Sequence, residues 1–316
     1  MSAKIVTVVG ATGTQGGSIV NTLLKNQDYI VRAVTRNPKS DTAQALAVKG
    51  AQVVQADLED VSSLIAAFQG SHAVFAVTNF FEPFVKSGAE KALEVEVQQG
   101  NNLTDAAAAT KTLEHFIWST LPDGRAISGG KHVVPHFESK NQIDRYIKSN
   151  PTLLAKTTFL WITYYASNYS YPMHTPYHIP TAGKYIQIQS TPADTPVFTI
   201  GDVHANVGPI VAAILAQPEK TLNGTVVHAY TEKTSAGELL QTWAQAQNKT
   251  AQYVQVDGST LNALWPGWSE EMSVMMEFWA SAREKSWSGE ARIITAADLG
   301  VKGLVGAKEA FAALKL

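Results

Sequence analysis

Three glycines near the start of the chain have a spacing that can bind phosphate groups. Gly10, Gly13 and Gly16 follow the apolar run KIVTVV (4–9) and precede the helical pattern SIVNTLLKN (18–26). A helix that begins directly after such a turn presents unpaired N–H groups and a partial positive charge. The pattern G-x-x-G-x-x-G between a strand and a helix predicts a site for a dinucleotide. The alternative is a glycine-rich turn that binds no ligand.

Each glycine has a separate expected role in this turn. Gly10 allows the tight turn, Gly13 lets the backbone approach a pyrophosphate because it has no Cβ, and Gly16 lets the helix pack close to the strand. The residues between the glycines share the turn and are expected to bind the dinucleotide as well: Thr12, Thr14 and Gln15.

The elements that must position this turn follow a regular alternation through the first half of the chain. Strands are expected at 29–36, 51–58, 72–79 and 113–120, and helices at 40–49, 60–69 and 88–111. This order predicts an α/β fold, a Rossmann-type doubly wound parallel sheet with helices on both faces. Ligands of such sheets bind at the carboxyl ends of the strands. The residues that end these strands are therefore candidates for the site.

The pattern changes after residue 150. Residues 157–169 indicate a strand that enters an aromatic-rich segment. Further strands are expected at 184–189, 224–230 and 252–256, with helices at 234–247, 269–285 and 304–315. Residues 198–220 indicate a strand, an N-cap at Asp202 and a helix. We expect a dinucleotide-binding domain at 1–155, with its sheet extended by later strands. Residues 156–316 would form a smaller C-terminal α/β substrate-binding region, interleaved with the first.

Composition limits the classes of function. The 316 residues carry a formal net charge of -2, which gives no reason to expect nucleic acid or an anionic membrane as a partner. The chain has no cysteine, which excludes thiolate catalysis and Cys-ligated metals. No run approaches the roughly 18 apolar residues of a membrane span, and no signal-peptide pattern is present. We expect a cytoplasmic protein with a small-molecule substrate and no bound metal.

The end of the second strand indicates which dinucleotide is bound. NAD-specific Rossmann domains place an acidic residue there, on the ribose 2′-hydroxyl. This chain has Thr35 and Arg36 instead, and Lys39 follows. A guanidinium would pair with a 2′-phosphate, so NADP(H) is the expected cofactor and Arg36 its ligand. Lys39 is either a second phosphate ligand or a surface charge.

The third strand ends in the run ADLED (56–60), which also carries cofactor candidates. Asp57 is expected either to reach the adenine amino group or to cap the next helix. Leu58 beside it is expected to contact the cofactor.

These segments together resemble the NmrA-like branch of the atypical short-chain dehydrogenase/reductase superfamily. The glycine motif is common to the superfamily, whereas the combination of segments is specific to the branch, and the resemblance covers nearly the whole chain. The matching segments are VVGATGTQGGS (8–18), RAVTRNP (32–38), VVQADLED (53–60), VFAVTNF (74–80), IWSTL (117–121), HFESKNQIDRYI (136–147) and FTIGDVHANVGPIV (198–211).

The resemblance implies an extended Rossmann domain, a smaller C-terminal α/β region and a cleft between them. It also implies a preference for NADP(H) at Arg36. Members of the branch are of two types. Some are reductases of quinones, ketones, imines or activated alkenes, and others bind the cofactor without turnover and report redox state to protein partners.

The superfamily's catalytic residues can be compared with this chain position by position. Standard members use a Ser, and a Tyr and a Lys spaced Y-x-x-x-K, in which Tyr donates a proton while hydride arrives from the nicotinamide. Here Ser119 or Thr120 stands near the expected Ser, Lys140 matches the Lys, and His136 replaces the Tyr. Histidine can serve as the acid, or His136 is a polar residue at the start of a helix. Lys140 is also expected to bind the nicotinamide ribose.

Two groups of residues are expected to line the rest of the cleft. The loop after the fourth strand lies next to the expected nicotinamide: Thr78, Asn79 and Phe80 are assigned to the cofactor, and Phe81 to the substrate. Two aromatic clusters would form a flat apolar pocket for an aromatic substrate: Tyr164, Tyr165, Asn168 and Tyr169, and Trp265 with Trp268. For Trp161 and the methionines at 272, 275 and 276, core packing is favoured over a place in the pocket.

The sequence therefore favours an NADPH-dependent reductase of a small aromatic or conjugated ketone, quinone, imine or enone. Such acceptors take hydride readily, so a missing Tyr argues against simple alcohol dehydrogenation more than against reduction in general. An NADP(H)-sensing regulatory protein that binds a protein partner is the alternative. A redox-neutral isomerase or cyclase on the same scaffold is a third hypothesis.

Overall fold

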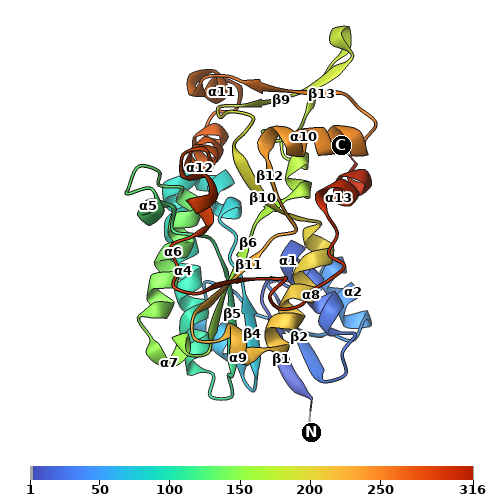
Figure 1. The fold of residues 1–316 in the computed structure, drawn as a ribbon. Helices are drawn as coiled ribbons and strands as arrows, with labels where there is room; N and C mark the ends of the chain where they lie inside the picture. Colours follow the sequence, from blue (N-terminus) through green and yellow to red (C-terminus); the bar gives the residue numbers. More distant parts are fainter. Residues whose placement is uncertain (1–2, 316) are drawn as a thin grey trace.

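The computed structural model describes residues 3–315, and an eight-stranded sheet forms its centre (Figure 1). All neighbouring strands in this sheet are parallel, in the order β14-β11-β6-β5-β4-β1-β2-β3. The bounds are β1 Lys4–Val8, β2 Tyr29–Thr35, β3 Gln52–Gln55, β4 Ala73–Ala76, β5 His115–Thr120, β6 Thr157–Ile162, β11 Thr225–Ala229 and β14 Ile293–Thr295. The Rossmann-type prediction is confirmed. The strand order reverses between β1 and β4, which is where doubly wound sheets bind ligands.

Helices cover both faces of the central sheet, and β4 shows how. Its side chains alternate, so Val74 and Ala76 join the core on one face while Ala73 and Phe75 join the core on the other. Helices α1 Thr14–Leu23, α2 Asp41–Val48 and α8 Val203–Ala216 pack on the Phe75 side. Helices α3 Val61–Phe68, α4 Phe81–Ala109 and α6 Pro135–Lys148 pack on the Val74 side. Three one-turn helices also occur: α5 Gly124–Ile127, α7 Pro151–Leu154 and α9 Pro218–Thr221.

Two small sheets and four helices lie beyond the carboxyl ends of the central strands (Figure 1). One sheet has the order β12-β10-β7 and the other β13-β9-β8. The strands are β7 Tyr164–Tyr165, β10 Pro196–Gly201, β12 Glu232–Ser235, β8 Tyr177–Ile179, β9 Lys184–Gln189 and β13 Ala251–Gln255. The helices are α10 Ala236–Ala246, α11 Gly258–Leu264, α12 Trp268–Ala282 and α13 Ala307–Ala313, with 3-10 turns at Ala166–Ser170, Pro180–Ala182 and Arg283–Trp287.

The structure differs from several of the expected elements. Helix α4 begins at Phe81 rather than at residue 88, and Gly88 interrupts it with φ 80°. The strand expected at 157–169 ends at Ile162, after which β7 leaves the central sheet and pairs with β10. Strands β8, β12 and β14 and helix α11 were not expected. The N-cap at Asp202 is confirmed, because its carboxylate accepts from the backbone N–H of His204.

The two predicted parts of the chain share one sheet. Strands β6, β11 and β14 come from beyond residue 155 and continue the sheet from β5. The division at residue 155 itself stays a prediction. Within residues 3–315, no helix is both long enough and apolar enough to cross a membrane.

Candidate functional site

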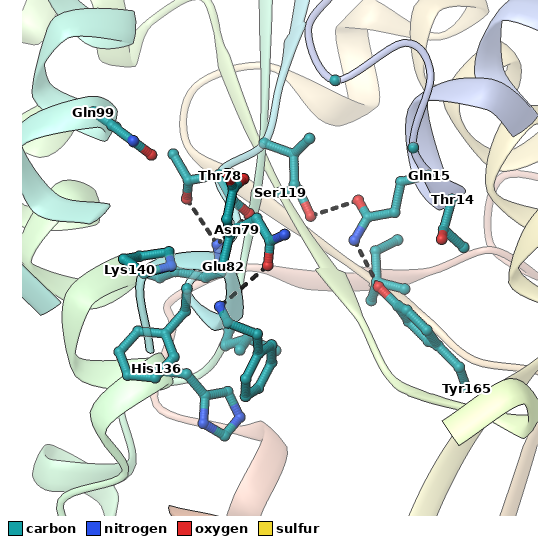
Figure 2. Close-up of a pocket in the computed structure, with 18 of the residues that line it drawn as sticks. Thr14, Gln15, Thr78, Asn79, Glu82, Gln99, Ser119, His136, Lys140 and Tyr165 are labelled. Carbon is teal, nitrogen blue, oxygen red and sulfur yellow. Dashed lines mark hydrogen bonds between the residues drawn. The ribbon is translucent and has the colours of Figure 1, made fainter. Parts of the chain in front are cut away.

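A cleft of about 1130 Å³ lies at the carboxyl ends of the central strands. The glycine-rich turn borders it on one side, and residues from β5, α4, α6 and α12 border it on the other. Figure 2 shows Gln15 and Tyr165 facing Ser119 across from His136 and Lys140. The volume of the cleft exceeds the roughly 300–1,000 Å³ typical of a pocket for one small molecule. The cleft is therefore large enough to hold a cofactor and a substrate together.

The glycine turn has the geometry that its spacing predicts. Gly10 has φ +65°, which side-chain-bearing residues rarely adopt. A Cβ on Gly16 would lie 2.3 Å from the carbonyl oxygen of Gly10, so the helix can pack this closely only with glycine. The cleft lining includes all six predicted residues of the turn: Gly10, Thr12, Gly13, Thr14, Gln15 and Gly16.

The N-terminus of α1 is open toward an anion. Its N-cap, Gly13, has no side chain to accept from the first N–H groups, and the first turn contains no acidic residue. The neighbouring helices α2 and α3 are instead capped by Ser40 and Asp60. The unpaired N–H groups of α1 and its dipole suit a phosphate. This part of the cleft therefore fits the pyrophosphate of a dinucleotide.

Arg36, directly after β2, lines the cleft but is paired with a residue that the sequence analysis missed. Its guanidinium donates two hydrogen bonds to the Glu82 carboxylate, at 2.9 and 2.8 Å. The hydrogen bonds from Arg36 lower the pKa of Glu82, and those to Glu82 raise the pKa of Arg36. Glu82 lies in the first turn of α4, whose early start the sequence did not reveal. Lys39 is exposed and outside the cleft lining, so the structure does not bring it to the site.

The run after β3 lies at the same end of the cleft. Asp57 and Leu58 both line it. The suggestion that Asp57 caps the next helix is wrong, because Asp60 accepts from the first N–H groups of α3. The Asp57 carboxylate accepts from the backbone N–H of Glu59.

Lys140 is held on the cleft wall by a buried polar cluster. Its Nζ donates to Glu96 Oε1 at 3.0 Å and to Thr78 Oγ1 at 3.0 Å. Thr78 donates to the same Glu96 oxygen at 2.7 Å, and Ser139 donates to the other. The Glu96 side chain is fully buried, so the four groups compensate one another's charge and hydrogen bonds.

Glu96 was also missed by the sequence analysis, although a signal was present. The buried face of α4 includes Ala92, Glu96, Gly100 and Leu103, at helical spacing. A glutamate on such an apolar stripe is rarely buried without a partner. The stripe therefore indicated a buried ion pair, with Lys140 on the neighbouring helix as its cation.

Ser119 and Thr120, at the end of β5, have different surroundings. The Ser119 hydroxyl donates to Gln15 Oε1 at 2.8 Å, and Gln15 Nε2 donates to the Tyr165 hydroxyl at 2.7 Å (Figure 2). Burial raises the pKa of Tyr165 to about 12. Thr120 instead donates to the buried carboxylate of Asp144, at 2.8 and 2.9 Å. Of the two, Ser119 is therefore the one whose hydroxyl belongs to the polar group at the glycine turn.

His136, near the start of α6, lines the cleft and is bound by a third residue that the sequence analysis missed. Its backbone N–H donates to Glu271 Oε1 at 3.2 Å, and its Nδ1 forms a short hydrogen bond to the same oxygen. The ring lies near Phe80 and Phe81, at centroid distances of 6.0 and 5.3 Å. Glu271 is buried and comes from α12, in the second half of the chain.

Aromatic side chains and methionines form a further part of the cleft lining. Phe81 stacks on Trp268 with ring centroids 5.9 Å apart and an interplanar angle of 16°. Trp265 stacks on Tyr177 at 5.9 Å. We call this part of the cleft the aromatic wall, and its members are Phe81, Tyr164, Trp265, Trp268, Met272, Met275, Trp279 and Trp287. Core packing was favoured for Trp161 and the three methionines, and all four side chains are buried. Met272 and Met275 also line the cleft.

Of the remaining candidate residues, the structure places four at the cleft and one in the core. Asn79, Phe80, Tyr165 and Asn168 line it. Tyr169 does not, because its ring is buried against Phe311 at 4.6 Å and Trp243 at 6.4 Å. The prediction that Tyr169 contacts substrate is therefore wrong.

Comparison with known proteins relates the chain to one family along most of its length. The model of the NmrA-like family matches residues 2–296. An NmrA-like family domain-containing oxidoreductase from Aspergillus hancockii is 32% identical over 260 residues, which cover 79% of this chain and 74% of that protein. Another from Aspergillus campestris is 31% identical over 263 residues, covering 80% of this chain and 76% of that protein.

Solved structures share the fold at lower sequence identity. The crystal structure of NmrA, a negative transcriptional regulator, in complex with NADP superposes with a TM-score of 0.77 at 21% identity, covering 99% of this chain and 96% of that one. An NADPH-dependent quinone oxidoreductase from Escherichia coli, complexed with NADPH, gives a TM-score of 0.64 at 17% identity, covering 90% and 93%. At these identities the likeness concerns the fold.

Proposed function

Because the chain belongs to the NmrA-like family, we propose that it is an NADPH-dependent oxidoreductase that reduces a small aromatic or conjugated ketone, quinone, imine or enone. One observation carries the proposal: a single cleft is lined by the open phosphate-binding turn, by Lys140 and His136, and by the aromatic wall. The relatives named as oxidoreductases and the quinone oxidoreductase complexed with NADPH support it.

The cofactor end of the cleft recognises charge. The N–H groups at the start of α1 bind the pyrophosphate, and the Arg36 guanidinium binds the 2′-phosphate. Arg36 must then share or leave its bidentate pair with Glu82. Asp57 and Leu58 contact the adenosine part, since they line the cleft beside Arg36.

The middle of the cleft positions the reacting groups. Reduced nicotinamide supplies a hydride when the cofactor is bound. Lys140, fixed by Glu96 and Thr78, binds the ribose hydroxyls without having to order a flexible side chain. Asn79 and Phe80 lie beside it after β4, and the Ser119 hydroxyl orients the substrate.

The aromatic wall selects the substrate. Stacked Phe81 and Trp268 with Trp279 and two methionines favour a flat apolar molecule over a small polar alcohol. Bound against this wall, an electron-poor carbon can approach the nicotinamide in an ordered geometry.

The first experiment measures NADPH binding and NADPH oxidation with a panel of quinones, aromatic ketones, imines and enones. Loss of NADPH absorbance that depends on one acceptor class, and that Lys140→Ala abolishes, supports the reductase. NADPH oxidation that is the same with and without acceptors contradicts it.

A second candidate function is an NADP(H)-sensing regulatory protein that binds a protein partner. It is favoured by the segment H-F-x-x-K at 136–140, in which His136 stands in place of the superfamily's Tyr, and by the fold shared with NmrA. Tight binding of NADP⁺ or NADPH, with turnover of no acceptor, would favour this candidate.

A further inference from the structure

The His136–Glu271 contact joins the two halves of the chain across the cleft. Glu271 lies 135 residues from His136, yet its Oε1 accepts both the backbone N–H and the ring Nδ1 of His136. The Glu271 side chain is 1% exposed and that of His136 is 9% exposed. A contact this deeply buried fixes the ring in one orientation.

The contact also fixes which ring nitrogen carries hydrogen. Oε1 acts as an acceptor here, because it receives the backbone N–H as well. Nδ1 is therefore the donor, and an imidazole with hydrogen on Nδ1 has Nε2 available for chemistry. Within residues 3–315, Nε2 has no hydrogen-bond partner, and His136 lines the cleft.

The surroundings of the ring contain few charges. Phe80 and Phe81 pack on it from the start of α4, and Phe137 packs on it from α6. The charged groups nearby are Glu271 on α12 and, one turn further along α6, Lys140 with its partner Glu96 on α4. Glu96 already compensates Lys140, so Glu271 is the carboxylate that acts on His136.

We propose that Glu271 is a positioning residue that holds His136 ready to donate a proton from Nε2 to the substrate. The inference rests on the proposed reductase function and narrows its substrate class to ketones and imines, whose oxygen or nitrogen must be protonated on reduction. A carboxylate that accepts from Nδ1 holds the ring in the tautomer and orientation that leave Nε2 facing the cleft.

Hydride from NADPH forms a C–H bond at the carbonyl or imine carbon, and the π electrons move to oxygen or nitrogen. The Nε2–H bond of His136 breaks and an O–H or N–H bond forms. Neutral imidazole remains with Nδ1–H bound to Glu271, and solvent returns a proton to Nε2 after product and NADP⁺ leave.

The test compares Glu271→Gln with Glu270→Gln, an exposed glutamate in the same helical turn. The amide introduced by Glu271→Gln retains an acceptor for Nδ1 but not the charge. With an active ketone or imine and saturating NADPH, we expect kcat of Glu271→Gln to fall by about 10- to 100-fold and its pH profile to change. NADPH affinity and thermal midpoint should stay near those of Glu270→Gln. His136→Gln should lose at least as much kcat as Glu271→Gln, and the double variant should lose no more than His136→Gln alone.

Two results would overturn the proposal while leaving the reductase function intact. One is Glu271→Gln with the kcat and pH profile of Glu270→Gln. The other is additive losses in the double variant, which would mean that Glu271 does not act through His136.

A spectroscopic readout applies even if Glu271→Gln folds poorly or no acceptor is turned over. Nitrogen-15 NMR of histidine-labelled protein should show hydrogen on Nδ1 of His136, identified by loss of its signals in His136→Gln. Hydrogen on Nε2 alone would contradict the proposed orientation. Absence of NADPH oxidation with every acceptor would instead overturn the reductase function.

Discussion

The guanidinium of Arg36 and the carboxylate of Glu82 meet in two parallel hydrogen bonds beside the cleft. Arg36 follows strand β2 of the central sheet, and Glu82 belongs to the first turn of α4. The same cation is thus available to a carboxylate of the protein or to a phosphate of the cofactor.

Arg36→Ala should weaken NADPH binding by roughly 10- to 100-fold and NADH binding much less, because only NADPH carries a 2′-phosphate. Glu82→Gln should strengthen NADPH binding, since the competing charge is removed. Fluorescence titration of both cofactors measures this. Lys39→Ala, exposed and outside the cleft, serves as the control. Equal losses for NADPH and NADH in Arg36→Ala would refute the assignment.

Lys140→Met should lower the free energy of unfolding by about 3–5 kcal/mol, because it leaves the buried charge of Glu96 without its cation. Lys140→Met combined with Glu96→Gln should recover most of that loss. Urea denaturation measures both. Lys91→Met, which breaks an exposed pair with Glu94, should cost less than about 1 kcal/mol. A double variant as unstable as Lys140→Met would show that the pair is not coupled.

Asp144 should make stability depend on pH. Burial raises its pKa from 3.8 to about 7, while the hydroxyl of Thr120 opposes the shift. The folded protein therefore binds a proton on the Asp144 carboxylate more tightly than the unfolded chain does. As pH rises from about 4 to about 7, the free energy of unfolding falls by roughly 4 kcal/mol.

Asp144→Asn should flatten the pH dependence of stability in that window, because Asn still accepts from Trp118 and Thr120 but does not titrate. Urea unfolding at a series of pH values is the measurement. Asp105→Asn, at an exposed position, should keep the slope of the parent protein. An unchanged slope in Asp144→Asn would mean that other groups cause it.

Trp268→Ala should raise KM for aromatic acceptors with little change in NADPH affinity, because the ring stacks on Phe81 at the substrate end of the cleft. Trp268→Phe keeps an aromatic face and should lose less. Steady-state kinetics with one aromatic and one aliphatic acceptor separates the effects. An equal rise in KM for both acceptors would argue against recognition by stacking.

Local sequence signals predicted the cofactor side of this protein well. The glycine spacing determines backbone geometry within seven residues, and Gly10 and Gly16 have the conformation and close packing that it implies. The alternation of strands and helices likewise predicted the central sheet, because each element has its own hydrophobic period.

Contacts between distant segments were not predictable in the same way. Glu82, Glu96 and Glu271 pair with Arg36, Lys140 and His136 over 46, 44 and 135 residues. Such pairings depend on how helices pack, and helical periodicity reveals only that a face is buried. Tyr169 shows the opposite error, a residue predicted at the site that lies elsewhere. Its aromatic segment does enter the cleft, but the Tyr169 side chain faces the core.

The shared central sheet also affects whether a fragment of the protein can be produced by itself. Strand β5 is buried along its whole length and pairs along one edge with β6, which begins at Thr157. A fragment cut at residue 155 would present β5 as a bare hydrophobic edge, which is a template for aggregation. The cofactor half should therefore fail as an isolated recombinant fragment, and the full chain should melt in a single cooperative transition.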